Sequence, residues 1–294
     1  MLNFGNLQQP RIINRSVSEE DKIDLVVQNK SLELAPKIED FKELVGDELI
    51  ALHKKKVKEI ESNPRYNNQE SEKGKLLEKL LAHDISFNDW LDGAFTVGTT
   101  RYDDCVNHTD FVIEWRVGED VLRLAVDTTV SGISTNDPSR ADDVIFRKTD
   151  YIAEEIVKGR GTTIQYLDSE AEDKKISVSD VPRVIIAFDH ENMDKYIDLT
   201  FKALKKVHGY KEKLINNYLQ ISLLREMISQ SERLIARMDM ERSFYYKGEK
   251  KPYADSDIYK NMVLLLNHLR KIKQEKGELV SSPRDRIEVI PLAA

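Results

Sequence analysis

Residues 111–126 form the segment that most constrains how this chain can fold. Two runs rich in β-branched and aromatic residues, 112–117 and 121–126, change the hydrophobic period to two and flank a turn at Gly118-Glu119. Glycine at the first central position favours a two-residue type II′ turn. Residues whose numbers sum to 237 then face each other across an antiparallel hairpin. One face becomes entirely apolar and is expected to cover the core, through the pairs Phe111 with Val126, Ile113 with Leu124 and Trp115 with Leu122.

The opposite face of this hairpin carries two aspartates. On it Glu114 faces Arg123 as an expected ion pair, and Asp110 falls opposite Asp127, although neither aspartate was used to choose the register. Opposed carboxylates repel each other, and a cation between them relieves the repulsion. A set of oxygen ligands with open positions suits Mg²⁺ or Mn²⁺. The alternative is that both aspartates simply end their strands at the solvent.

A lysine on the following helix favours a metal site over solvent-exposed strand ends. The pattern predicts a helix over residues 141–158 that ends at Gly159, with Ile145, Ile152 and Ile156 on its apolar side. Lys148 lies three residues after the first isoleucine and four before the second, so it points towards the sheet. A lysine in this position either extends its stem to reach solvent or meets a buried anion. A carboxylate site would supply that anion.

Other segments complete an alternating order of helices and strands. Pro36 suits the first turn of a helix that runs to about Ser62, and a break over residues 63–68 follows. Strands are predicted at 162–167 and 183–188, with a loop of acidic residues and lysines between them. The second of these strands is apolar without alternation, which is typical of a strand covered on both faces. Further helices are predicted at 69–83, 193–207, 210–240 and 258–276.

Composition narrows the class of protein. No stretch approaches the ~20 apolar residues of a membrane span, and the N-terminus lacks a basic region followed by an apolar core. The single cysteine, Cys105, excludes an internal disulfide and suits a reducing compartment, so we expect a cytoplasmic protein. The net charge is −7, but residues 201–276 hold 17 Lys and Arg against 9 Asp and Glu. This basic tail fits an enzyme that holds a polyanion, although charged helices are commonly just solvated.

The pattern of acidic residues resembles the PD-(D/E)xK nuclease superfamily. An aspartate opens one hairpin strand, an acidic residue closes the next, and the order helix, three-strand meander, helix, strand matches much of residues 69–188. The resemblance implies an α/β fold: a mixed β-sheet of restriction-endonuclease-like type flanked by helices. It also implies that Asp110 and Asp127 bind the metal, with Glu78 as the glutamate of the first helix.

The chain departs from the family pattern at two positions. Thr109 stands at the position of the family's proline, a substitution that the family often shows, and Thr129 stands where its lysine belongs. Some members have moved the lysine to the following helix, and Lys148 would be that replacement, where it positions or activates the attacking water. Without it, the site would bind metal poorly or be inactive.

Two further groups of residues are candidates for function. Asp104 and His108 could complete the metal shell, orient water or act as a general base, or could belong to a plain polar loop. The connection 242–253 mixes cations with aromatics that can contact phosphates and stack on bases. Its candidate contacts are Tyr245, Tyr246, Lys247, Lys250 and Lys251. It is also where a helical hairpin has to turn.

We therefore predict three regions and one main function. These are an N-terminal lead-in and helix (1–68), a nuclease-like core (69–200) and a helical C-terminal region (201–294). The expected activity is Mg²⁺- or Mn²⁺-dependent hydrolysis of nucleic-acid phosphodiesters, with DNA favoured over RNA, no membrane association and a possible homodimer through the C-terminal helices. The alternative is an inactive module on the same fold that serves as a protein-binding or nucleic-acid-binding scaffold.

Overall fold

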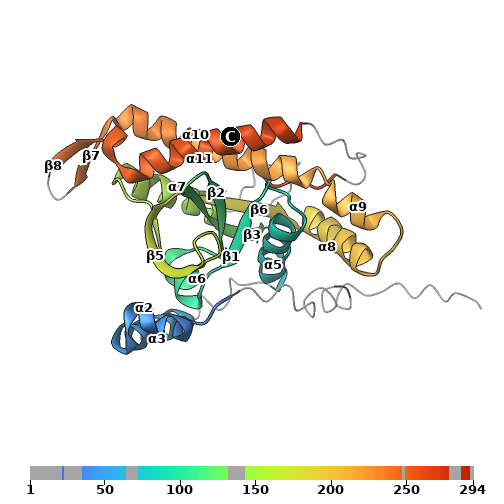
Figure 1. Cartoon of the computed structure of the whole chain (residues 1–294), viewed down its shortest axis with the longest axis horizontal. Helices are drawn as coiled ribbons and strands as arrows, with labels where there is room; N and C mark the ends of the chain where they lie inside the picture. The colour runs from blue at the N-terminus through green and yellow to red at the C-terminus, as the bar shows by residue number, and fades with distance from the viewer. Residues whose placement is uncertain are drawn as a thin grey trace, which may run out of the picture.

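A four-stranded mixed sheet organises the chain in a computed structural model that describes residues 22, 35–63, 72–131, 143–246, 249–277 and 286–291. Its strands are β1 (Phe95–Gly98), β2 (Phe111–Val117), β3 (Asp120–Ser131) and β6 (Arg183–Asp189), in the order β1-β2-β3-β6. The first three form an antiparallel meander, and β6 runs parallel to β3. The chain is therefore a mixed α/β protein with helices flanking the sheet (Figure 1).

The predicted hairpin register is confirmed over the whole of β2, but the strand pairing does not extend to the predicted pair of Asp110 with Asp127. Phe111 lies opposite Val126, and Val117 lies opposite Asp120 at the turn. Gly118 has φ +65°, a backbone conformation that glycine adopts without steric cost. The expected ion pair also forms, because Arg123 Nε donates to Glu114 Oε1 over 2.8 Å.

The apolar face of the sheet packs against helices from both halves of the chain. These are α5 (Glu72–Phe87), α8 (His190–Leu204), α9 (Tyr210–Ile215), α10 (Leu219–Glu241) and α11 (Asp257–Lys276). Phe111, Trp115 and Leu124 of the hairpin share one core cluster with Leu223 and Leu265 of the two long helices. Figure 1 shows α10 and α11 side by side along this face. The apolar stripes that suggested a helical extension are thus buried within this chain, and a homodimer through these helices remains a prediction.

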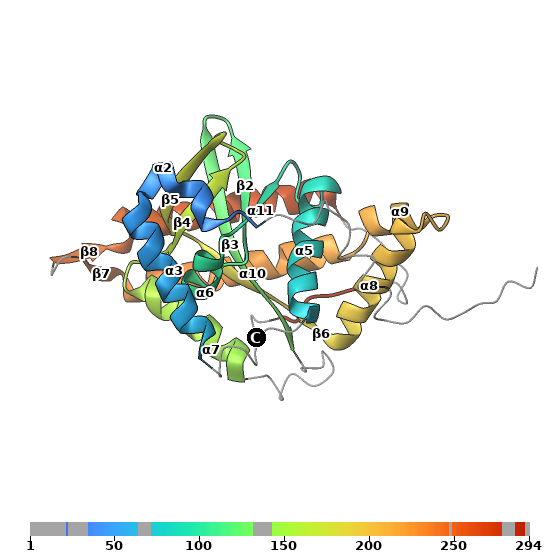
Figure 2. The ribbon, with the colours of Figure 1, turned by 90° about the horizontal axis from the view of Figure 1, so that it is seen from below.

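The other face of the sheet is covered by α7 (Asp143–Val157) and by a second hairpin, β4 (Thr162–Ser169) with β5 (Lys174–Val181). On α7, Ile152 and Ile156 pack against Ile185 and Ala187 of β6, as the predicted stripe requires. The side chain of Ile145 lies outside the described residues. Figure 2 shows β4 and β5 beside β2 and β3; α7 also contacts α10, and β5 also contacts α11.

Strand β6 is an outer strand of the sheet but has the apolar composition of a central one, because its free edge is buried and hydrogen-bonded. All seven of its residues are buried. Gln230 of α10 accepts a hydrogen bond from Ile185 N (3.0 Å) and donates to Ile185 O (2.7 Å), and Ile290 N donates to Ala187 O (2.7 Å). A side-chain amide therefore takes the place of a neighbouring strand, which keeps the buried backbone groups paired.

Two predicted helices are each divided. The segment expected to be one helix from Pro36 to Ser62 consists of a 3₁₀ turn η2 (Ile38–Phe41), α2 (Lys42–Val45) and α3 (Asp47–Glu61), because Gly46 has φ +81° and ends the first part. The predicted helix over 210–240 breaks between α9 and α10, where Asn217 Oδ1 accepts from Leu219 N (2.9 Å). An asparagine side chain that satisfies the backbone in this way competes with helix continuation.

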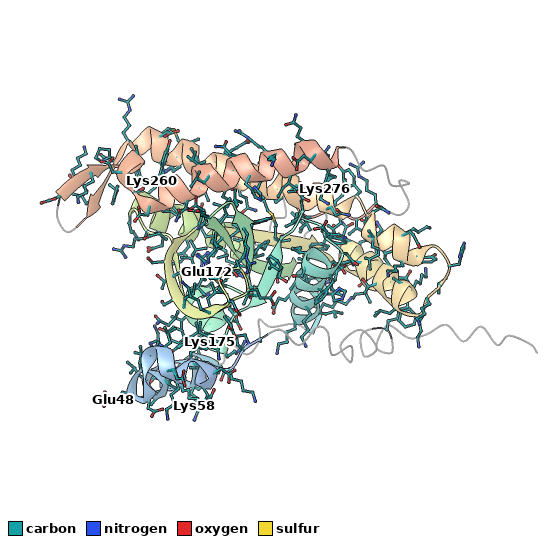
Figure 3. All side chains as sticks on the ribbon, in the orientation of Figure 1. Glu48, Lys58, Glu172, Lys175, Lys260 and Lys276 are labelled. Atoms are coloured by element: carbon teal, nitrogen blue, oxygen red, sulfur yellow. The ribbon has the colours of Figure 1, made fainter. Side chains whose placement is uncertain are left out.

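Several elements were not predicted. Strand β1 had been given no predicted range, helix α6 (Arg101–Asn107) lies where a polar loop was one alternative, and β5 replaces the expected acidic loop. The connection 242–253 forms a β-hairpin, β7 (Ser243–Tyr246) with β8 (Glu249–Pro252), followed by η4 (Tyr253–Asp255). Lys175 of β5 reaches the N-terminal helices, where its Nζ donates to Asp40 O over 2.8 Å (Figure 3). None of the described helices combines the length and the apolar character of a membrane span.

Candidate functional site

The backbone of β1, β2 and β3 positions the two aspartates. Asp110 directly precedes β2, and its N–H donates to Val126 O over 2.9 Å, so the hydrogen bonding here shifts by one residue from the hairpin register, in which Val126 lies opposite Phe111. Thr99, directly after β1, donates its N–H (3.2 Å) and its hydroxyl (3.0 Å) to Asp110 O. Asp127 lies within β3 and is buried, with 4% of its surface exposed. Both residues therefore lie on strand backbone that hydrogen bonds hold in place.

The Asp110 carboxylate lies in a cavity of about 590 Å³ that Glu78, Thr99 and Asp104 also line. Its Oδ2 accepts hydrogen bonds from Thr128 N (2.6 Å) and Thr128 Oγ1 (2.9 Å). Burial raises the pKa of Asp110 well above its ordinary value, and the charges of Glu78, Asp127 and Asp104 raise it further. Three other carboxylates are thus close enough to disfavour the charged form of this one.

Lys148 contacts Asp127, as its position on the helix predicted. Its Nζ lies 2.7 Å from Asp127 Oδ1, with 34% of the lysine side chain and 6% of the aspartate side chain exposed. Burial alone would lower the pKa of Lys148, but the charge of Asp127 and the hydrogen bond to it outweigh burial and raise the pKa. Lys148 therefore remains a cation at neutral pH, able to orient an anion or a water but not to accept a proton.

The two carboxylates have separate partners in this structure. Asp110 accepts from Thr128, whereas Asp127 pairs with Lys148. Among the described residues, no group of three or more His, Cys, Asp and Glu side chains is arranged closely enough to hold a metal ion. The predicted ligands are therefore neighbours rather than an assembled shell.

The remaining predicted metal ligands lie on two sides of the pair. Asp104 of α6 forms an ion pair with Arg101, which also donates to Glu61 Oε1 over 2.9 Å, at the cavity of Asp110. His108 ends α6 with φ +53°, and its ring lies edge-on to Tyr151 of α7, with 6.3 Å between ring centroids. Burial lowers the pKa of His108, Asp127 opposes this shift, and Arg183 and Lys148 add to it.

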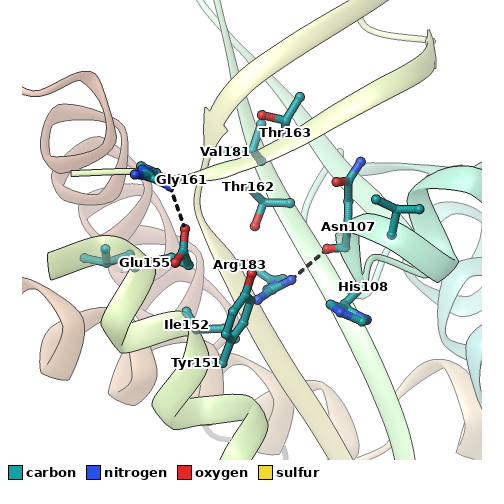
Figure 4. Close-up of a pocket in the computed structure, with 13 residues that line it drawn as sticks. Asn107, His108, Tyr151, Ile152, Glu155, Gly161, Thr162, Thr163, Val181 and Arg183 are labelled. Carbon is teal, nitrogen blue, oxygen red and sulfur yellow. Dashed lines mark hydrogen bonds and ion pairs between the residues drawn. The ribbon is translucent and has the colours of Figure 1, made fainter. Parts of the chain in front are cut away.

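Arg183 was not predicted to belong to the site. It opens β6, only 7% of its surface is exposed, and it lines a pocket of about 210 Å³ with His108 and Tyr151 (Figure 4). Burial lowers the pKa of Arg183, and the nearby Asp127 opposes this shift. The available sequence signal was a cation at the start of an otherwise apolar strand, because such a residue has to find a buried partner or a ligand.

The predicted nucleic-acid contacts lie on the β7–β8 hairpin. Tyr245 pairs with Lys250, and Phe244 pairs with Lys251. The Tyr245 side chain is 71% exposed, as a base-stacking surface requires, while Phe244 is buried against Tyr253. Lys247 and the side chain of Tyr246 lie outside the described residues. The hairpin is at the end of the long helices, away from the sheet (Figure 1).

Comparisons with known proteins add no relative: no protein-family model, no curated protein and no solved structure matches this chain. The geometry of its own residues is therefore what carries a functional proposal.

Proposed function

We propose that this protein is a divalent-metal-dependent nuclease of PD-(D/E)xK type, hydrolysing nucleic-acid phosphodiesters at Asp110 and Asp127. The observation that carries the proposal is the contact of Lys148 with Asp127, beside Asp110, whose pKa is raised by burial and by neighbouring carboxylates. A buried carboxylate with a raised pKa in a cavity is typical of catalytic sites.

The arrangement of the core supports the same proposal. Helix α5 precedes an antiparallel meander, and α7 leads through the β4–β5 hairpin to β6, which runs parallel to β3. The family resemblance implies this order of helix, three strands, helix and strand. Asp110 opens the middle strand of the meander and Asp127 lies on the third, while Glu78 lies on the preceding helix near the Asp110 cavity. These are the positions that the resemblance assigns to the metal ligands.

The chemistry of these residues fits a hard divalent cation. Burial raises the pKa of Asp110, repulsion from Glu78, Asp127 and Asp104 raises it further, and a cation among these carboxylates would relieve the repulsion. Asp110 and Asp127 would hold Mg²⁺ or Mn²⁺, with Asp104 or His108 completing the shell. When bound, the ion would act as a Lewis acid for water activation and for the charge of the phosphodiester.

The residues of the chain have distinct roles in this proposal. Thr128 orients Asp110 through two hydrogen bonds, so one carboxylate oxygen is held while the other is left for the ion. Lys148, kept protonated by Asp127, would orient the attacking water or a phosphate oxygen. Its contact with Asp127 then holds the ammonium group in place until substrate arrives.

A cleavage assay tests the proposal. Purified protein is incubated with single-stranded DNA, duplex DNA and RNA in Mg²⁺, Mn²⁺ or EDTA. We expect metal-dependent cleavage that falls by at least about 100-fold in Asp110→Asn and Asp127→Asn, because each removes a metal ligand. Asp168→Asn, an exposed strand aspartate, is the matched control and should cleave normally. Cleavage that survives Asp127→Asn unchanged would remove this site assignment.

The separate partners of the two carboxylates favour a second candidate, an inactive module on the same fold. Thr129 occupies the usual lysine position, and Lys148 is already paired with Asp127. Such a scaffold would bind nucleic acid or protein without hydrolysis. Calorimetric titration with Mn²⁺ separates the two candidates, because a scaffold shows no binding that depends on Asp110 and Asp127.

A further inference from the structure

A buried arginine beside the proposed catalytic pair forms no ion pair with a described residue. Arg183 donates from Nη1 to Asn107 O over 2.7 Å. Its Nε is buried without a hydrogen-bond partner, and no described residue accepts from Nη2 or forms an ion pair with the guanidinium. Nε and Nη2 make up one edge of the guanidinium fork, the edge that binds a carboxylate or phosphate through two parallel hydrogen bonds.

An aromatic ring and polar side chains surround the Arg183 guanidinium. Tyr151 lies over the guanidinium, 5.7 Å from ring centroid to Cζ, and its own side chain is half exposed. Figure 4 shows Arg183 at the centre of the pocket, between Tyr151, Thr162 and His108. The pocket therefore offers a cation, three hydroxyl groups (those of Tyr151, Thr162 and Thr163) and an imidazole around one small space.

The charge of the pocket favours an anion. Glu155 is the one described carboxylate in its lining, and it pairs with Lys158 (2.8 Å) and with Arg160 (3.7 Å), which lines the same pocket. Arg183 is then the charged residue of the lining that has no ion-pair partner among the described residues, and the charge of Asp127 acts on it from outside the lining. The volume of about 210 Å³ is below the roughly 300–1,000 Å³ of pockets that bury drug-sized ligands, so the space suits a single small anion.

We propose that this Arg183 pocket is a phosphate-binding site, in which the Nε and Nη2 edge of Arg183 holds one phosphoryl group. The buried N–H without an acceptor and the absence of an ion pair to a described residue carry the proposal, because a buried donor without an acceptor is costly and a phosphate oxygen satisfies it. Tyr151 and Thr162 are the neighbouring hydroxyls that can contact the remaining oxygens.

We infer that the phosphoryl group belongs to a nucleic-acid strand, and this step rests on the proposed function. The pocket adjoins the proposed catalytic pair. His108 lines the pocket, and its pKa is raised by the charge of Asp127 and lowered by the charge of Lys148. A strand held there by one phosphate would present a neighbouring phosphodiester to Asp110 and Asp127. Two sources share this chemistry: a terminal 5′-phosphate and an internal phosphodiester.

Binding of inorganic phosphate to the full-length chain, in EDTA and against chloride of equal ionic strength, tests the site without catalysis. We expect saturable binding by calorimetry. Arg183→Met should weaken it about tenfold or more, the factor expected from the loss of a charge-assisted hydrogen bond. Arg237→Met, an exposed arginine of α10 paired with Glu241, is the matched control and should stay within about twofold of wild type.

A second variant keeps the test decisive if Arg183→Met does not fold. Thr162→Glu leaves Arg183 in place and puts a carboxylate in the pocket, so it should block phosphate while preserving the fold. Absence of phosphate binding in the wild type, or binding unchanged in a folded Arg183→Met or Thr162→Glu variant, would overturn the proposal.

Oligonucleotides with and without a 5′-phosphate then distinguish the two sources. Tighter binding of the phosphorylated strand that depends on Arg183 assigns the terminal group, and equal Arg183-dependent binding assigns the internal one. Phosphate binding by a chain that cleaves no nucleic acid would keep this site and remove the nuclease, so the two proposals fail separately.

Discussion

Replacing Lys148 with methionine tests the pair at the centre of the proposed site. Methionine keeps much of the apolar stem but removes the ammonium group, so Asp127 is left without its cation. Asp127 is almost fully buried, and Lys148 Nζ lies 2.7 Å from its Oδ1. The expected cost is therefore that of leaving one carboxylate buried and unpaired.

Burial of the two partners sets the magnitude. Breaking a fully buried ion pair costs about 3–5 kcal/mol, whereas a solvent-exposed pair contributes about 0.2–1 kcal/mol. Here the aspartate side chain is 6% exposed and the lysine side chain is 34% exposed. Solvent partly screens the lysine, so we expect Lys148→Met to lower the free energy of unfolding by about 1–3 kcal/mol.

Urea denaturation at pH 7 in EDTA measures this loss. The two tryptophans, Trp90 and Trp115, are both buried in the core, so their fluorescence reports unfolding. Lys271→Met is the matched control, since its pair with Glu275 has a length of 3.7 Å and both side chains are more than half exposed.

A double-mutant cycle separates the pair from the individual residues. Adding Asp127→Asn to Lys148→Met should recover part of the loss, because the neutral amide no longer needs a cation. A loss for Lys148→Met no larger than that for Lys271→Met, or strictly additive effects in the cycle, would refute the reasoning.

Three further predictions concern other parts of the molecule. The native pKa of Asp110 lies above the ordinary value of 3.8, so between these two pKa values the folded chain keeps a proton that the unfolded chain releases. The free energy of unfolding therefore falls as pH rises from about 3.8 through the native pKa. The stability gained in Asp110→Asn over wild type should therefore grow across that window in urea titrations without metal, and a pH-independent difference would contradict the shift. Gln230→Leu leaves the buried N–H and C=O of Ile185 unpaired and should cost about 2–4 kcal/mol in the same assay; a loss below about 1 kcal/mol would show that the edge does not need the amide. If the β7–β8 hairpin contacts nucleic acid, Tyr245→Ala should weaken single-strand binding by about 1–3 kcal/mol, and Lys250→Ala should lower the salt slope of binding by about 0.7; affinities and slopes equal to wild type would remove this contact.

The hairpin was predictable because few quantities determine it. A two-residue turn and one apolar face determine which residues lie opposite each other, and the observed pairs follow that rule from Phe111 to Val117. The position of Lys148 follows equally from helical spacing, since Ile152 and Ile156 on the same stripe are buried. Periodicity was strong in both cases.

The hydrogen bonds of the site were not predictable to the same degree. Register determines which backbone positions face each other, but it does not determine side-chain rotamers. Asp110 therefore accepts from Thr128 rather than sharing a direct contact with Asp127. Arg183 was missed for a similar reason, because its role depends on Asn107 and Tyr151, which lie far from it in sequence.

The prediction of secondary structure failed where the sequence signals were short or mixed. Strand β1 has four residues, and α6 is a seven-residue helix rich in polar side chains, so neither has enough length for a period to emerge. In β5 the alternation of Ile176 and Val178 was present but was outweighed by the charges around it. Gly46 was the available signal for the break before α3, because a positive φ there costs glycine little.

The central claim is that Asp110 and Asp127 share one divalent cation. Crystals soaked in Mn²⁺ and measured by anomalous diffraction test it most directly. We predict an anomalous peak bonded to oxygens of both carboxylates, with Lys148 released from its 2.7 Å contact with Asp127 or sharing that carboxylate with the ion. A structure without a peak between the two residues, in which Lys148 still pairs with Asp127 and Thr128 still pairs with Asp110, would contradict it.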